Sequence, residues 1–302
     1  MNSTAIDLSR LASPQLVEII DFETLLADRK ARLISLYPAD KQAEVAATLE
    51  LESEPLVVLL QESCYREITL RQRINDAARG VMLAYARGTD LEHLAALMGV
   101  ERLVVRPADP TTDTAAVMEG DDDLRTRIQL APEGFSVAGP QGAYIATAMN
   151  AHGLVLDAAA QSPAPGSVLV TILSRDGDGT ADEHLVAAVT AAVNGEDARP
   201  LTDNVTVQSA EIVTYQVAAK IYTFPGPDSG VVMAEARKRL DEYLAACHRI
   251  GREVAISGIH AALHLTGIER VELTAPMANV QTNNTQSPYC TSVELMYGGV
   301  HG

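Results

Sequence analysis

Apolar side chains recur every three or four positions through the first hundred residues, the spacing that places them on one face of an α-helix. One such run begins at Phe22 and ends before Pro38, and a shorter one covers residues 41–51. Residues 55–87 predict a single long helix, because Pro55 suits a first turn and no other glycine or proline occurs before Gly80. At 1.5 Å per residue this helix would be about 45 Å long, more than a compact domain of this size needs.

The predicted long helix carries an apolar stripe on one face and charged pairs on the other. Four-residue spacing joins Glu62 to Arg66 and Glu67 to Arg71, which suits a solvent-exposed face. A short helix capped by Asp90 should follow. The apolar stripe consists of Leu56, Leu60, Cys64, Ile68, Ile74, Ala78, Val81 and Tyr85.

In the rest of the chain the spacing of apolar residues is helical in some segments and alternating, as in strands, in others. Residues 106–120 are rich in Pro, Thr, Asp and Ala without periodicity, which is typical of a linker or an exposed loop. Two helices should follow, one beginning with the acidic residues 121–123 and one at Pro140. Beyond these we expect strands at 168–173, 205–207, 212–222, 268–273 and 291–297, and helices at 181–193, 231–247 and 257–265.

This order of elements predicts an α+β protein with an N-terminal helical domain. The succession β-α-β-β-α, followed by a closing strand, fits a split βαβ, or ferredoxin-like, sandwich. We therefore expect a helical bundle domain at 1–105, a linker and middle α/β segment at 106–166, a ferredoxin-like domain at 167–274, and a C-terminal loop and strand at 275–302.

The composition and charge of the chain disfavour some classes of binding partner. Of its 302 residues, 47% are hydrophobic and 21% charged, which is ordinary for a folded protein. The 23 basic and 40 acidic residues give a formal charge of −17, which disfavours binding to nucleic acid or to an anionic membrane surface. No apolar run approaches the roughly 20 residues of a membrane span, and Asp7 stands where a secretory signal would be basic. We expect a soluble protein that folds in a cytoplasm.

The sequence holds no complete catalytic or metal-binding motif. His260 and His264 have the four-residue spacing of a zinc peptidase, but Ala261 replaces its general-base glutamate. Residues 176–179, rich in Asp and Gly, suggest a calcium loop, yet Ala187 stands where an EF-hand needs its glutamate. We therefore assign no catalytic, cofactor or metal residue. A metal-dependent hydrolase that uses the two histidines stays an alternative.

Longer segments of the sequence carry a resemblance to a known family. They are DFETLLADRKARLISLYP from residue 21, then LELESEPLVVLLQESCYREITLRQRINDAARGVMLAYARGTDLEHLA, and further along DDDLRTRIQLAPEGFSVAGPQGAY and YTFPGPDSG. Over nearly its whole length the chain resembles the baseplate assembly protein J family of contractile-tailed bacteriophages and phage-like tailocins. Proteins of this family are related to the larger wedge protein of T-even phages.

The resemblance implies a structural wedge subunit of a tail baseplate. Two copies of such a protein form a helical bundle with one companion wedge protein, and their later domains close a ring around the hub and spike. The implied partners are that companion, a second copy of the chain, and sheath-initiator-type and hub or spike proteins. Assembly would take place in the host bacterial cytoplasm. A chaperone that leaves the finished particle is another alternative.

The family expectation places contacts with partner helices on the apolar stripe. The competing interpretation is that these residues pack only within their own chain. The residues assigned to partner-helix contacts are Leu56, Leu60, Ile68, Ile74 and Val81.

Overall fold

The computed structural model describes residues 8, 11, 21–136, 139–195, 199–200, 202–226 and 228–300. These residues form two compact units that divide between Leu97 and Met98. The first unit is helical and the second combines sheets and helices, so the predicted α+β class with N-terminal helices is confirmed. Asp7, on which the expectation about a secretory signal rests, lies outside the described residues.

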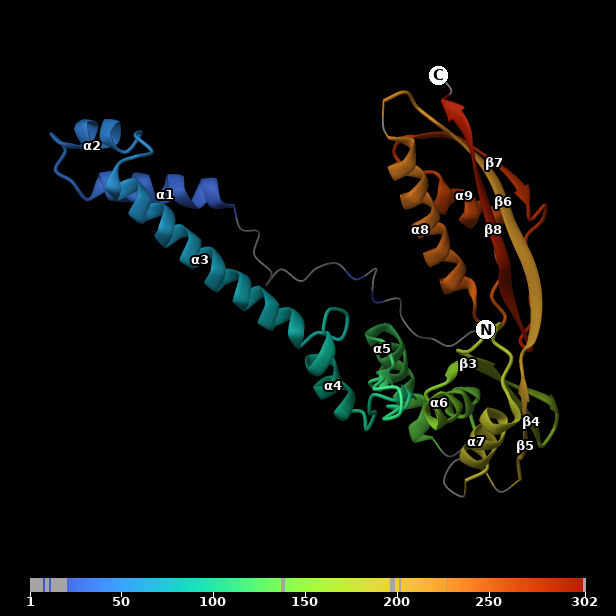
Figure 1. Ribbon diagram of the computed structural model, residues 1–302. Coiled ribbons are helices and arrows are strands. Elements are labelled where there is room, and N and C mark those ends of the chain that lie inside the picture. The colour runs from blue at the N-terminus through green and yellow to red at the C-terminus, as the bar shows by residue number, and fades with distance from the viewer. Residues whose placement is uncertain are drawn as a thin grey trace. The chain divides into compact units, whose positions relative to one another are not determined.

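Among its described residues the N-terminal unit has four α-helices, of which the third is the longest (Figure 1). Pro55 begins this helix, as predicted, at a position where its missing N–H costs no hydrogen bond. Asp21 caps the first helix, and hydrogen bonds from the hydroxyl and the backbone N–H of Thr24 lower the pKa of its carboxyl group. The helices are α1 (Phe22–Ser35), α2 (Gln42–Thr48), α3 (Pro55–Gly80) and α4 (Gly88–Ala96).

The long helix α3 ends at Gly80, so the predicted end at Arg87 is wrong. Residues 81–85 form turns, which leaves Val81 beyond the last helical residue. Glycine lowers helix stability by about 1 kcal/mol relative to alanine. At this position it also allows a close approach, because a Cβ on Gly80 would come within 2.9 Å of a carboxylate oxygen of Asp90.

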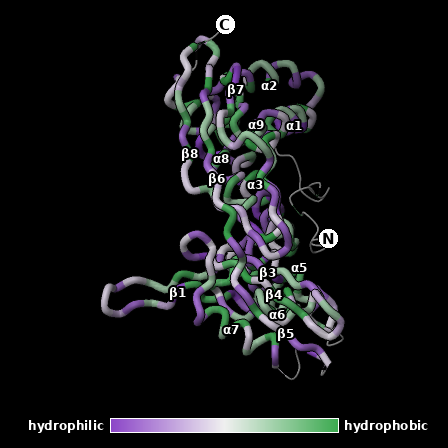
Figure 2. The backbone as a smooth tube through the Cα atoms, turned by 90° about the vertical axis from the view of Figure 1, so that its right-hand side faces the viewer, coloured by the Kyte–Doolittle hydropathy of each residue, from purple (hydrophilic) through white to green (hydrophobic). Residues whose placement is uncertain are grey.

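The second unit begins with a β-hairpin where the sequence predicted a linker. Strands β1 (Val104–Arg106) and β2 (Val117–Met118) pair antiparallel, and the residues between them form the connecting loop. Figure 2 shows this hairpin standing out from the rest of residues 98–300. The strands are too short to produce the alternating pattern by which a strand is recognised in a sequence.

A three-stranded sheet follows, with strand order β3-β4-β5. β3 and β4 are antiparallel and turn at Gly166, whose positive φ of 74° suits glycine, whereas β4 and β5 are parallel and connected by α7. The sequence did not predict β3, which is rich in alanine instead of β-branched residues. These elements are α5 (Asp121–Leu130), the 3-10 helix η2 (Ala131–Phe135), α6 (Gln141–Ala151), β3 (Val155–Ala164), β4 (Ser167–Ser174), α7 (Glu183–Val193) and β5 (Asn204–Ser209).

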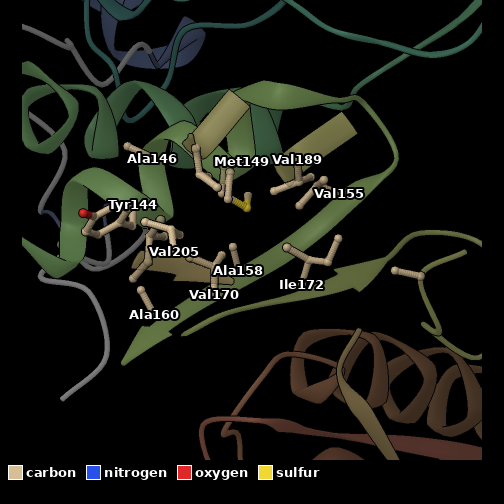
Figure 3. Packing of buried hydrophobic residues seen from close by; sticks show 14 of the residues in the cluster. Tyr144, Ala146, Met149, Val155, Ala158, Ala160, Val170, Ile172, Val189 and Val205 are labelled. Carbon is tan, nitrogen blue, oxygen red and sulfur yellow. The ribbon is translucent and has the colours of Figure 1, made fainter. Parts of the chain in front are cut away.

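The first core lies between this sheet and the helices α6 and α7 (Figure 3). Tyr144 is 1% exposed, and its hydroxyl donates a hydrogen bond of 2.7 Å to Asp203 at the edge of the core. The remaining contacts are apolar. Their main contributors are Ile145, Met149, Val155, Val170, Ile172, Leu185, Val189 and Val205.

A second three-stranded sheet has the strand order β7-β6-β8. The central strand β6 is antiparallel to β7 and parallel to β8. Alternate residues of β6 pack beneath α8 and α9, which cover one face of the sheet (Figure 1). The elements are β6 (Glu211–Thr223), α8 (Ser229–Cys247), α9 (Ile256–Leu263), β7 (Ile268–Ala275) and β8 (Gln286–Val300).

The strands predicted to form one ferredoxin-like sandwich at 167–274 therefore lie in two sheets. Only Ala210 separates β5 from β6. Its N–H still bonds to the carbonyl of Ile172 in the first sheet, at 2.8 Å, whereas the next N–H, of Glu211, bonds to Thr285 beside the second sheet, at 2.9 Å. Two strands with so short a connection resemble consecutive strands of one sheet in sequence, which explains the wrong assignment.

Candidate protein-binding surfaces

One face of α3 packs against α1 within the N-terminal unit. Val57 is 1% exposed and Cys64 is fully buried, with Leu26 of α1 and Leu49 also buried in this unit. The guanidinium of Arg29 on α1 donates to the Ser63 hydroxyl at 2.9 Å. This face of α3 is therefore already occupied by the chain itself.

Glu67 of α3 belongs to the packed face, although the sequence predicted it to be exposed. Its carboxylate forms ion pairs with Arg29 of α1 and with Arg71 one turn along α3. Hydrogen bonds from Arg29 and then Arg71 lower the pKa of Glu67. The predicted pair of Glu62 and Arg66 is exposed, as expected.

A second apolar face of α3 remains uncovered within the described N-terminal unit. Its residues lie within about 60° of one another around a helix of 3.6 residues per turn. Such a face is usually buried against another element or a partner. We call it the outer α3 face; its members are Leu56, Leu59, Leu70 and Ile74, which are 39%, 62%, 61% and 65% exposed.

The five residues predicted to contact partner helices do not share one face. Leu56 and Ile74 lie on the outer α3 face, whereas Leu60 and Ile68 are half-buried on the side of Cys64. Val81 is 73% exposed but lies beyond the end of the helix. Contact of these five with a partner stays a prediction.

Sequence reasoning missed Leu59 and Leu70, which belong to the outer α3 face. Their spacing contained the signal, since positions 56, 59, 63, 70 and 74 follow a second series of three- and four-residue steps, with one turn omitted. Polar Ser63 and Arg66 interrupt this second series, so the apolar stripe through Leu60, Cys64 and Ile68 is the more continuous pattern in the sequence.

A buried ion pair holds the base of the hairpin to α5 in the second unit. Arg127 is 4% exposed and pairs with Glu119, which is 3% exposed. Arg127 also donates to the carbonyl of Glu101 at 3.0 Å and to the side chain of Asn150 at 2.8 Å. Burial lowers the pKa of Arg127, and the charge of Glu119 opposes that shift. These contacts hold Glu101 and Glu119, at the two ends of the hairpin segment, to Arg127 of α5.

The residues considered for metal binding do not form a cluster of ligands. Within the described part of the chain, no group of three His, Cys, Asp or Glu side chains could hold a metal ion. His260 lies on α9 and His264 at its C-terminal end. In the Asp- and Gly-rich loop, Asp178 accepts the N–H of Thr180 and Asp176 pairs with Arg106, so its carboxylates stabilise the loop.

None of the helices in the described ranges is both long enough and apolar enough to cross a lipid bilayer.

Three family models match consecutive parts of the chain. They are the Baseplate J-like N-terminal domain at residues 52–109, the Baseplate J-like central domain at 136–209, and the Baseplate J-like protein C-terminal domain at 215–296. The central match ends with β5, and the C-terminal match covers most of the β6-to-β8 region. The two sheets thus correspond to two family domains.

A known protein matches almost the entire chain. Baseplate protein J of Escherichia phage P2 is 52% identical over 296 residues, which are 97% of this chain and 98% of that protein. Among solved structures, a chain in the cryo-EM structure of the anti-feeding prophage baseplate gives a TM-score of 0.39 at 14% identity. That match covers 60% of this chain and 43% of the other. On the sequence match to the phage P2 protein and the three family domains, the chain belongs to the baseplate J-like family.

Proposed function

We propose that this chain is a non-enzymatic structural subunit of the baseplate of a contractile phage tail or a related phage-like particle. Its membership of the baseplate J-like family supports this function, as does the name of its phage P2 relative. The observation that carries the mechanism is the outer α3 face, because four large apolar side chains stay exposed on a helix whose neighbouring face is already packed.

In finer detail, we propose a wedge subunit whose outer α3 face joins a helical bundle. Knobs-into-holes packing by a helix of a companion wedge protein or of a second copy would bury Leu56, Leu59, Leu70 and Ile74. The sheets of the second unit would contribute to a ring around the hub and spike, with assembly in the host cytoplasm. The chain would act through interfaces that form during assembly and rearrange on host contact.

Substitution on the outer α3 face tests the bundle. Ile74→Asp should abolish co-purification with the companion wedge protein, because it places a charge in a contact that is otherwise apolar and buried. Thr69→Asp is the matched control, since it adds the same charge to an exposed position on the other side of α3. Retained complex in Ile74→Asp, at the level of the control, would contradict the proposal.

The position of the substitution matters for the interpretation of this test. Ile68→Asp would place its charge on the half-buried side of α3, where it also disturbs packing within the chain. Loss of binding in that variant would not separate misfolding from a lost interface. Circular dichroism of Ile74→Asp should match the unmodified chain, because Ile74 is 65% exposed.

Retention in the finished particle separates a subunit from an assembly chaperone. Quantitative mass spectrometry of purified tails should find the chain in a fixed ratio to the other baseplate proteins. Its absence from purified tails would favour the chaperone.

A further inference from the structure

A cavity of about 420 Å³ lies inside the second unit, beside the first core. Its volume is within the range of about 300–1,000 Å³ that is usual for binding pockets. Helix α6 and the end of α5 form one side, the middle of β3 forms the base, and residues 249–252 after α8 form the other side. Figure 3 shows Met149 and Ala158, two of its lining residues, among the buried side chains of the first core.

The side of this cavity formed by α5 and α6 is apolar and belongs to the packed core. Leu130, Ile145 and Met149 line it, and all three belong to the buried core. On the opposite side, Ile250 is 4% exposed and its N–H donates to the Asp157 carboxylate at 2.8 Å. The cavity is therefore formed before any occupant binds, which reduces the entropy cost of binding.

Two arginines, Arg249 and Arg252, line one side of the cavity, and the Arg249 guanidinium donates to the carbonyl of His248 at 2.9 Å. Arg249 lies 3.7 Å from Asp123, a long contact, and Asp123 makes its closer ion pair with Arg175. Arg252 is exposed and makes no ion pair with any carboxylate among the described residues. Both groups therefore have capacity to bind another carboxylate, and arginine does so in a two-pronged geometry.

Two acidic residues, Asp157 and Glu133, also line the cavity. Asp157 accepts backbone N–H groups from Ala158 and Ile250 with its two oxygens, and burial raises the pKa of Asp157. Glu133 lines the α6 side, across the cavity from residues 249–252. The chain as a whole carries −17, but exposed charges farther than about 8–10 Å are screened at physiological salt. A carboxylate that enters here is therefore attracted on the side of the arginines and repelled on the side of Glu133.

We propose that this cavity binds an acidic segment of another baseplate protein. One large apolar side chain of that segment lies on Leu130, Ile145 and Met149, and a neighbouring carboxylate pairs with Arg252 and Arg249. This inference rests on the proposed function, because it requires the chain to be assembled with other baseplate proteins. It assigns a second interface, in the second unit, in addition to the outer α3 face.

Site-specific crosslinking identifies the occupant. The photoreactive residue benzoylphenylalanine, placed at the exposed cavity position Thr126 of the full chain, is activated after co-expression with the neighbouring tail proteins. Mass spectrometry should find a crosslinked peptide from another baseplate protein, with Asp or Glu adjacent to Leu, Ile, Met or Phe. A peptide from a second copy of this chain, a basic peptide, or no crosslinked peptide would overturn the proposal.

Charge reversal then tests the role of the arginines. Arg252→Glu should reduce the yield of the crosslink by about tenfold or more, since one partner of an interfacial charge pair becomes repulsive. Arg239→Glu is the matched control, because Arg239 is an exposed arginine on α8 outside the cavity. Changing the acidic residue of the captured segment to lysine should restore the yield with Arg252→Glu. Equal yields in both arginine variants would overturn the proposal.

Failure of this inference is distinguishable from failure of the proposed function. Arg252→Glu leaves the outer α3 face unchanged, so this variant should still co-purify with the companion wedge protein. If the unmodified chain itself neither co-purifies nor is retained in tails, the proposed function fails. If it is retained but the crosslink is absent or insensitive to charge, only the cavity assignment fails.

Discussion

At the scale of single residues, Arg127 and Glu119 form the least exposed ion pair among the described residues. Bringing two charges into a protein interior is costly, and the cost is offset only while both are present and hydrogen-bonded. Arg127 meets this condition with bonds to Glu119, Glu101 and Asn150. The pair is therefore sensitive to the loss of either member.

Arg127→Met should lower the free energy of unfolding by about 3–5 kcal/mol, because Glu119 would stay buried without its partner. Urea unfolding of the full chain, followed by circular dichroism, measures this change. Arg239→Met serves as the control, since the exposed pair of Arg239 with Glu235 should contribute less than about 1 kcal/mol. Similar losses in the two variants would mean that burial does not determine the effect.

Tyr144 gives the core a dependence on alkaline pH. Burial, and next its hydrogen bond to Asp203, raises the pKa of Tyr144 to about 12, from about 10 in an unfolded chain. A raised pKa means that the stabilisation is complete below about pH 10 and is lost as the pH rises through about 12.

Tyr144→Phe should therefore cost about 1 kcal/mol near neutral pH, the usual net value of one hydrogen bond. The difference in unfolding free energy between variant and parent should shrink as the pH rises above about 10. Urea unfolding at several pH values measures it. A difference that stays constant from neutral pH to about pH 12 would contradict this assignment.

At the scale of elements, the hairpin of β1 and β2 depends on one glycine. A Cβ on Gly153, in the turn between α6 and β3, would lie 2.2 Å from the carbonyl oxygen of Val104 and 3.1 Å from the Cα of Val105. Backbone atoms cannot move aside as a flexible side chain can. The absence of a side chain at Gly153 lets the hairpin strand pass directly over this turn.

Gly153→Ala should destabilise the second unit by about 1–3 kcal/mol, the usual cost of forcing an extra methyl group into packed structure. Differential scanning fluorimetry and urea unfolding would detect the change. Gly134→Ala is the control, because its Cβ would meet only the Ala146 side chain at an ordinary 3.5 Å. An unchanged Gly153→Ala protein would show that the hairpin is not held at this turn.

Helices and strands were predicted well where the apolar periodicity continued over many residues and a proline, glycine or capping residue marked the end of the element. Pro55 begins α3, the helices predicted at 181–193 and 231–247 correspond to α7 and α8, and the strand predicted at 212–222 corresponds to β6. The strand β3 and the short hairpin escaped prediction because alanine-rich and two- or three-residue strands carry little period-two signal. Gly80 was assigned to a helix interior because local sequence does not reveal the approach of Asp90.

The candidate interface on α3 was predicted only in part, for a reason that lies in tertiary packing. Periodicity identifies apolar positions, but α3 has two apolar sides, and the packing of α1 decides which one is left exposed. Leu60 and Ile68 were therefore grouped with Leu56 and Ile74, although the first two are half-buried and the last two are exposed. The cavity beside α6 had no local signal, because its lining comes from residues 126–159, 249–252 and 284.

At the scale of the whole molecule, the second unit contains two cores built from its own residues. Residues 98–302 expressed without residues 1–97 should therefore fold cooperatively, with an unfolding free energy of about 5–15 kcal/mol. Circular dichroism and urea unfolding of this fragment test the expectation. A fragment that lacks near-ultraviolet signal and a cooperative transition would show that its cores are incomplete.

Ala210 has a mechanical consequence for the second unit. A longer connection between β5 and β6 would let one sheet tilt relative to the other. Ala210 is a single buried residue whose N–H is bonded to Ile172, so it cannot extend to allow such a tilt. Leu173 and Ile250, which pack around Ala210, close the same joint from both sides. The two sheets should therefore turn together as one rigid body when a force is applied to either of them.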